Sequence, residues 1–218
     1  MGRREENKAQ KQAALEEAAL ALFVAQGYHR TSVEQIVTEA GVARGTFYLY
    51  FASKSALFKH LLNKVLDPLM ASLTRCRRAI GEAHDTAEVR DAFMQLSAEA
   101  VSLVLAHRDL TLLYYSEQRD PGAIGVWLRE QGHRIEAFAE DMVRALTDRG
   151  LLRPIEPSVA ALIITGAIDK LAFAFLSGAD LGNPMSVGSA VVQLFGVGLL
   201  VEPEAYLSTP EPSTKHDR

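Results

Sequence analysis

The segment that most constrains the fold runs from Thr31 to Leu61 and reads TSVEQIVTEAGVARGTFYLYFASKSALFKHL. Apolar residues recur at helical spacing on both sides of Gly41, where a left-handed glycine can end a helix at no steric cost. We expect a capping box between Thr31 and Glu34 to start the first helix, and a second helix to run from about Ala43 to Tyr50. Two short helices around a glycine turn indicate a helix-turn-helix unit.

The flanking sequence supplies further helices around this unit. A helical stripe from Leu15 to Phe23 ends at Gly27, and Ser53 is placed to cap a helix that begins with Lys54. Spacing alone leaves two interpretations open, because two short helices around a glycine also occur in proteins that never meet nucleic acid. The flanking helices favour a DNA-binding bundle.

The stretch ALALFVAQGYHRTSVEQIVTEAGVARGTFYLYFASKSALF resembles, nearly position by position, the amino-terminal domain of the TetR family of transcriptional regulators. The match runs from Ala13 to Leu62, and the rest of the chain resembles the family only in length and helical character. One departure is Ala43, which stands where the family often has a hydroxyl cap. The loss of such a cap costs about 0.5–2 kcal/mol, so we expect Val42 and Phe47 to hold the turn by packing.

The resemblance implies an all-α fold: a three-helix helix-turn-helix DNA-binding domain followed by a six-helix ligand-binding and dimerisation domain. We place the first domain at residues 1–52, the second at 53–201 with its first helix as connector, and a tail without fixed structure at 202–218. No alternating strand pattern is seen. The helices expected after the first three are Ser53–Ile80 with a kink or break at Pro68, Thr86–His107, Asp109–Glu117, Gly125–Arg149, Pro157–Ser177 and Met185–Leu200.

A helix that enters the major groove needs small or flat side chains at its leading face and donors at its rim. The leading-face candidates are Arg44, Gly45, Thr46, Tyr48 and Leu49, and the rim candidates are Thr31, Tyr50 and Lys54. By resemblance, Tyr48, Tyr50 and Lys54 occupy phosphate-contacting positions, whereas Arg44 and Thr46 sit where base edges are read. Core packing is the alternative for each tyrosine, and Phe47 and Phe51 are expected in the core.

The charge is unevenly divided along the chain. The net charge is −4 overall, +3 over residues 1–64 and −7 over the remainder, so a basic head precedes an acidic body. Arg3, Arg4, Lys8 and Lys11 are expected as an arm before the first helix, either touching DNA or, as we favour, solvated beside acidic neighbours. The lone cysteine, Cys76, cannot form an internal disulfide, and no leader precedes Ala13, so we expect a cytoplasmic protein.

Two apolar stretches, 159–176 and 187–201, are interpreted as buried helices of a soluble protein rather than membrane spans. Because helix-turn-helix proteins usually bind twofold operators as pairs, helices 157–177 and 185–200 are the expected homodimer surface. Small residues on them, Gly188 among them, would allow close packing across the axis. Completion of the monomer core is the alternative.

The remaining helices would enclose a mostly apolar pocket for a hydrophobic or aromatic small molecule. Its candidate lining residues are Phe93, His107, Tyr114, Tyr115, Trp127, Gln131, Arg134, Phe138, Asp169 and Phe173. No metal site and no cofactor are expected, and the absence of HExxH, paired-cysteine and GxSxG patterns argues against an enzyme.

The sequence therefore predicts a ligand-responsive transcriptional regulator, most simply a repressor that a small effector releases from a palindromic double-stranded DNA operator. The alternative is a helical scaffold or small-molecule-binding protein that does not bind DNA.

Overall fold

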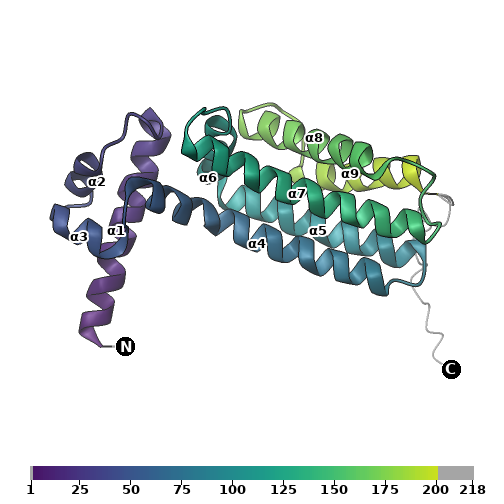
Figure 1. The fold of residues 1–218 in the computed structure, drawn as a ribbon, viewed down its shortest axis with the longest axis horizontal. Coiled ribbons are helices and arrows are strands. Elements are labelled where there is room, and N and C mark those ends of the chain that lie inside the picture. The colour runs from purple at the N-terminus through teal and green to yellow at the C-terminus, as the bar shows by residue number, and fades with distance from the viewer. Residues whose placement is uncertain (1, 201–218) are drawn as a thin grey trace, which may run out of the picture. The chain divides into compact units, whose positions relative to one another are not determined.

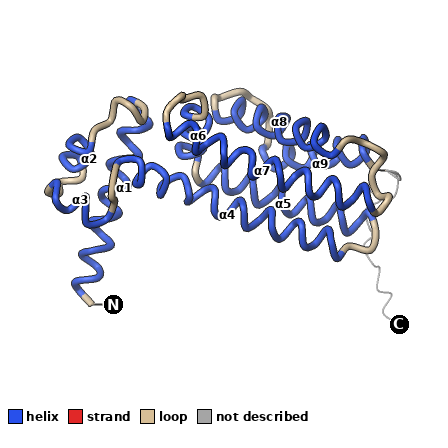
Figure 2. The backbone as a smooth tube through the Cα atoms, in the orientation of Figure 1, coloured by secondary structure: helices blue, strands red, loops and turns tan. Residues whose placement is uncertain are grey.

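Nine α-helices make up the computed structural model over residues 2–200, which are the residues it describes (Figure 1). They are α1 Arg3–Gln26, α2 Val33–Glu39, α3 Arg44–Tyr50, α4 Lys54–Glu82, α5 Thr86–Ala106, α6 Arg108–Glu117, α7 Ala123–Asp148, α8 Pro157–Leu176 and α9 Pro184–Leu199. Within that range the structure has helices and loops and no strand (Figure 2), and the only extended pairing is an isolated bridge between Leu152 and Leu200. The all-α prediction is confirmed, and the tail predicted at 202–218 lies outside the described residues.

The start of α2 differs from the sequence prediction by one residue. Ser32, not Thr31, is its N-cap: the Gln35 backbone N–H donates to Ser32 Oγ at 3.2 Å, and the Ser32 N–H donates to Gln35 Oε1 at 2.8 Å. The predicted box between Thr31 and Glu34 was therefore wrong. The Thr31 hydroxyl instead donates to the carbonyl oxygen of Gly27 at 2.9 Å, which holds the turn after α1.

Two other predictions about helix limits need correction. The first helix begins at Arg3, so Lys8 and Lys11 lie on α1 and not on an arm before it. Acidic residues in its first turn favour this early start, because they interact well with the positive end of the helix dipole. The fourth helix continues through the exposed Pro68 without a break, so the predicted break was wrong, and the predicted kink stays a prediction.

The described chain contains two compact units, and the first includes more than the predicted head. It comprises residues 1–71, 102–134 and 172–179. Its core joins side chains of α1, α2, α3, α4, α6 and α7, and three of its rings pack edge to face: the Phe58 centroid lies 5.3 Å from that of Phe23 and 4.9 Å from that of Tyr28. The division at residue 52 stays a prediction, but α6 shares a core with the three head helices.

The second unit comprises the described residues at 72–101, 135–171 and 180–200. Arg149 follows α7 and closes the end of α4, because its guanidinium donates to the carbonyl oxygens of Ile80, at 2.6 Å, and Ala83. On α9, a Cβ added to Gly188 would lie 2.5 Å from Ser97 Oγ of α5. This small residue therefore allows close packing inside one chain, and its predicted role across a dimer axis stays a prediction.

Helices α8 and α9 expose much of their apolar surface. The most apolar window of α8 is only 17% buried, and α9 has no buried residue. The prediction that both helices are buried is thus wrong for a single chain. Among the described helices, α8 alone is long and apolar enough to cross a membrane. One such helix is weak evidence for a membrane protein, because core helices of soluble proteins can have the same length and composition.

Candidate nucleic-acid interface

The turn between α2 and α3 is held by backbone hydrogen bonds and packing. Gly41 has φ +64°, which allows the Val42 N–H to donate back to the Val37 carbonyl oxygen at 3.0 Å. Ala43 caps α3 without a side-chain hydrogen bond, and the first turn closes through the Thr46 N–H and the Ala43 carbonyl oxygen at 2.8 Å. The missing hydroxyl cap is thus tolerated next to the fully buried Phe47.

One face of α3 is packed and the other is exposed. Phe47 and Phe51 are 0% and 6% exposed, which confirms both as core residues, whereas Tyr48 and Leu49 are 48% and 81% exposed. The Tyr48 ring stands edge-on against Phe47, with the centroids 5.3 Å apart. Tyr50 is half-buried and packs against the core. Helix α3 therefore presents one aromatic ring, Tyr48, and one aliphatic side chain, Leu49, to solvent.

Gly45 and Thr46 lie on the accessible part of α3. A Cβ added to Gly45 would meet no atom of this chain within 4 Å. Nothing inside the protein therefore requires glycine at this helical position, where it costs about 1 kcal/mol relative to alanine. An external surface that approaches the backbone closely would require it.

Arg44, the first residue of α3, forms an ion pair with Glu34 of α2 through Nη1 and Oε1. A hydrogen bond with the Tyr48 hydroxyl, followed by the charge of Glu34, raises the pKa of Arg44. Both side chains of the ion pair remain more than half exposed. The guanidinium is therefore accessible but already oriented by two neighbours.

The structure turns two of the predicted rim residues inward. Thr31 is 2% exposed and its hydroxyl is bonded within the turn, which argues against a phosphate contact by this side chain, and the contact stays a prediction. The Lys54 ammonium donates to the carbonyl oxygens of Tyr28 at 2.7 Å and Thr31 at 2.6 Å, and lies 4.2 Å from the Tyr28 ring centroid. Burial lowers the pKa of Lys54, against the opposing charge of Glu117.

The turn after α1 makes a second set of contacts that the sequence analysis did not predict. The Tyr28 backbone N–H donates to Glu117 Oε1 at 3.1 Å, and His29 Nε2 lies 3.0 Å from Asp120 Oδ1. The hydrogen bond from the Gly122 N–H, and then the His29 contact, lower the pKa of Asp120. These partners come from the end of α6 and the turn after it, so the head is tied to α6.

Gly125 is required by that same turn. A Cβ added to Gly125 would lie 1.9 Å from the Asp120 carbonyl oxygen, a distance that no side chain tolerates. The Asp120–Gly122 turn was recognisable from its residue types, but nothing in the sequence shows what it contacts.

The structure distributes the ten predicted pocket residues over both units. In the first unit Tyr114, Tyr115 and Phe173 form a ring series with centroid distances of 5.4 and 5.9 Å, and Arg134 donates to Gln131 Oε1 at 2.7 Å. The same unit holds His107 at the start of α6 and Trp127 beneath the Lys59 ammonium. The second unit holds Phe93, Phe138 and Asp169. A single pocket lined by all ten stays a prediction.

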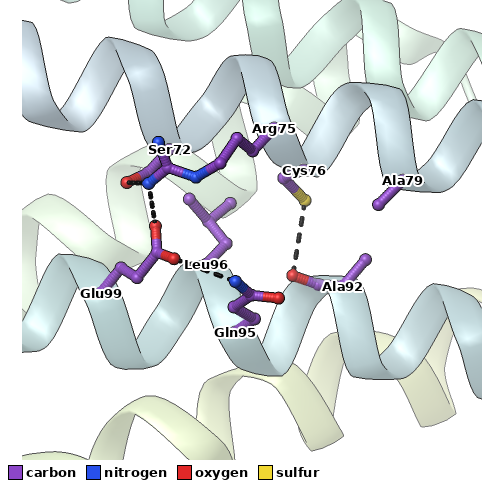
Figure 3. A pocket seen from close by; sticks show the side chains of 8 residues that line it. All are labelled: Ser72, Arg75, Cys76, Ala79, Ala92, Gln95, Leu96 and Glu99. Atoms are coloured by element: carbon purple, nitrogen blue, oxygen red, sulfur yellow. Dashed lines mark hydrogen bonds and ion pairs between the residues drawn. The ribbon is translucent and has the colours of Figure 1, made fainter.

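A small hollow between α4 and α5 is lined by none of these ten residues (Figure 3). Its volume is about 30 Å³, whereas ligand pockets usually measure about 300–1,000 Å³. Its polar groups already bind one another, since Arg75 Nη2 lies 2.8 Å from Ser72 Oγ and 2.5 Å from Glu99 Oε2. Burial, and then the charge of Glu99, raise the pKa of the Cys76 thiol to about 12. The hollow is too small for a drug-sized ligand.

A tight helix-turn-helix with one exposed face on its second helix is the arrangement with which helix-turn-helix DNA-binding regulators enter the major groove. Residues 15–61 match the family model described as "Bacterial regulatory proteins, tetR family". Over these residues the chain is similar to the DNA-binding part of the tetR family.

The relatives found by sequence include HbdR, an HTH-type transcriptional regulator of Aromatoleum sp. (strain CIB), which is 32% identical over 139 residues. The aligned region is 63% of this chain and 58% of HbdR, so the chain spans less than two-thirds of that relative. YfiR of Bacillus subtilis (strain 168), also named an HTH-type transcriptional regulator, is 26% identical, with 70% of this chain and 73% of YfiR aligned.

Among solved structures, NalD, the secondary repressor of the MexAB-OprM multidrug efflux pump in Pseudomonas aeruginosa, matches with a TM-score of 0.67 and 26% identity, covering 90% of this chain and 99% of NalD. The complex of SmeT with triclosan matches with a TM-score of 0.70 and 19% identity, covering 93% and 98% of the two chains. At 19% identity, the similarity to SmeT is a similarity of fold.

Proposed function

We propose that this protein is a dimeric transcriptional regulator that binds a palindromic double-stranded DNA operator and releases it when a hydrophobic or aromatic small molecule binds the helical body. The observation that carries the proposal is the exposed face of α3. Tyr48 and Leu49 stand out from a knob whose Phe47 is fully buried. A monomer gains nothing from exposing these side chains, whereas a groove-binding helix requires such a face.

The charge distribution supports DNA as the partner. Residues 1–64 carry +3 and the remainder −7. A basic head on an acidic body orients the molecule on a polyanion and keeps the body away from it. The affinity would then fall linearly on a plot of log affinity against log salt, since each phosphate contact releases counterions.

The exposed apolar surface of α8 and α9 supports a homodimer through these helices. On these two helices the large apolar side chains with 39% to 72% exposure are Val159, Leu162, Ile163, Ile168, Phe173, Met185, Leu194 and Val197. Exposed apolar side chains gathered on two neighbouring helices are unusual for a monomer and typical of an interface. A second copy of the chain is the natural cover, because a twofold operator needs two heads in fixed register.

The effector would bind in the body and act through a shift of population between two states. Aromatic residues such as Tyr115 and Phe173 suit an apolar or aromatic ligand, and SmeT, a protein of the same fold, was solved with triclosan. The bound ligand would favour a pose of α4 that separates the two heads. A coupling of about 1–3 kcal/mol would weaken operator binding by roughly fivefold to more than a hundredfold.

Selection of bound fragments from random duplexes, followed by affinity measurements on the recovered operator, tests this function. Two half-sites related by a twofold axis are expected. Tyr48→Ala should lose most operator affinity while its circular dichroism and its oligomeric state stay unchanged. If the wild-type protein recovers no sequence, or if Tyr48→Ala binds DNA like wild type, the chain is a helical scaffold or small-molecule-binding protein instead.

A further inference from the structure

An acidic side chain lies on the face that we assign to DNA. Glu34, in the first turn of α2, is 57% exposed and pairs with Arg44 at the start of α3. A carboxylate is repelled by phosphates, so its presence beside the recognition helix opposes affinity. Acidic residues are favoured in the first turn of a helix, which explains an acid at this position but not the pairing with Arg44.

Stability does not explain the pair either. Ion pairs between exposed side chains contribute little to folding, because water screens them and two long side chains lose rotamer freedom. Arg44 and Glu34 are 63% and 57% exposed. The consequence of the pair therefore lies in the position of the guanidinium rather than in the free energy of unfolding.

Arg44 is held from two sides. Glu34 binds Nη1 from α2, and the Tyr48 hydroxyl bonds to the guanidinium from the next turn of α3. A guanidinium has five N–H donors, so donors remain for a base after both contacts. An arginine fixed in this way has lost much of the freedom to reach for a phosphate, and the contact that suits its planar fork is the O6 and N7 pair of guanine.

We propose that Glu34 is a specificity-determining residue that positions Arg44 for guanine and penalises binding to DNA that lacks this guanine. The inference rests on the proposed function. With the correct base, Arg44 keeps its carboxylate and gains a bidentate contact. With a wrong base Arg44 stays paired with Glu34 and gains no base contact, while the carboxylate still repels the phosphates, so affinity for non-specific DNA stays low.

The test compares Glu34→Gln with a matched control, Glu39→Gln, which removes the same charge from the exposed other end of α2. Affinities are measured for the selected operator and for a shuffled duplex of equal length at several salt concentrations. Glu34→Gln should raise the affinity for the shuffled duplex severalfold and reduce the ratio of operator to shuffled affinity about tenfold. Glu39→Gln should leave that ratio unchanged.

A double-mutant cycle separates positioning from charge. In an Arg44→Ala background, Glu34→Gln should no longer change the ratio, because its effect passes through the arginine. Equal changes in the two Gln variants, an unchanged ratio in Glu34→Gln, or additivity in the cycle would overturn the inference while the operator still binds. A wild-type protein without any sequence preference would instead overturn the proposed function, and this inference with it.

Discussion

Tyr28 and Glu117 are joined by a hydrogen bond across 89 residues of sequence: the Tyr28 backbone N–H, in the turn after α1, donates to Oε1 of the last residue of α6 at 3.1 Å. A Cβ on Gly27, the residue before Tyr28, would lie 3.6 Å from the same oxygen. The carboxylate of Glu117 is therefore fitted against the turn that precedes α2. Any displacement of α6 acts directly on the head.

Glu117→Ala should lower the free energy of unfolding by about 1–3 kcal/mol, because a partly buried N–H loses a charged acceptor. Glu117→Gln retains an acceptor and should lose less. Urea denaturation of the whole chain measures both. Glu130→Ala, an exposed position on α7, is the control, and an equal loss in that variant would show that the Tyr28 contact contributes nothing.

Lys54→Met should destabilise the protein by about 1 kcal/mol or more, since the carbonyl oxygens of Tyr28 and Thr31 lose an ionic donor. Operator affinity should fall because the turn before α2 loosens. The slope of log affinity against log salt should stay unchanged, whereas loss of a phosphate contact reduces it by about 1. Lys11→Met on α1 is the control for charge. If Lys54→Met reduces the slope by that amount, Lys54 does contact a phosphate.

Gly45→Ala should make the protein more stable and a weaker DNA binder. Alanine gains about 1 kcal/mol of helix propensity, and the new methyl group enters space that is open within the chain. It would, however, keep the α3 backbone away from the groove. Gly81→Ala in α4, also without neighbours within 4 Å, should gain stability and keep its operator affinity. Thermal unfolding and operator titration check both variants, and full operator affinity in Gly45→Ala would exclude close backbone approach.

Acid should weaken the contact between α1 and α4 through Glu16. Burial raises the pKa of this carboxyl, but hydrogen bonds from Lys64, Gln12 and His60 outweigh burial and leave the pKa below the ordinary value of 4.5. A depressed pKa means that the stabilisation is present above pH 4.5 and is lost as the pH falls through the folded-state pKa. Unfolding measured from pH 6 to 3 should show a shallower loss in Glu16→Gln than in wild type. Glu17→Gln should follow the wild-type curve, and identical curves for all three proteins would contradict the assignment.

Leu162→Glu should convert a dimer into a folded monomer, because a charge at a position that is 57% exposed in one chain would be buried by the second copy. Val126→Glu on α7, where the valine is 45% exposed, should leave the dimer intact. Sedimentation velocity distinguishes the two. A dimer that survives Leu162→Glu would place the interface on another face.

Local sequence was sufficient for the helices and for the helix-turn-helix. Apolar periodicity, glycines at helix ends and the 3.6-residue repeat act over one or two turns, so they can be read without tertiary contacts. Phe47 and Phe51 were recognisable as core residues and Gly41 as the turn residue for that reason. The choice between Thr31 and Ser32 as the cap of α2 could not be predicted locally, because it depends on which hydroxyl donates to the Gly27 carbonyl oxygen.

Tertiary structure alone decided which polar side chains remain available to a partner. Lys54 and Thr31 carry the hydrogen-bond donors of typical phosphate ligands. In the folded chain both donate instead to carbonyl oxygens of the turn after α1. Glu117 has no sequence signal of any kind, and its role follows from a contact made 89 residues away. Periodicity specifies which face of a helix is apolar. It does not specify the partner of a charged group, because hydrogen bonds act only over about 3 Å. That partner is set by the three-dimensional arrangement of segments that are distant in sequence.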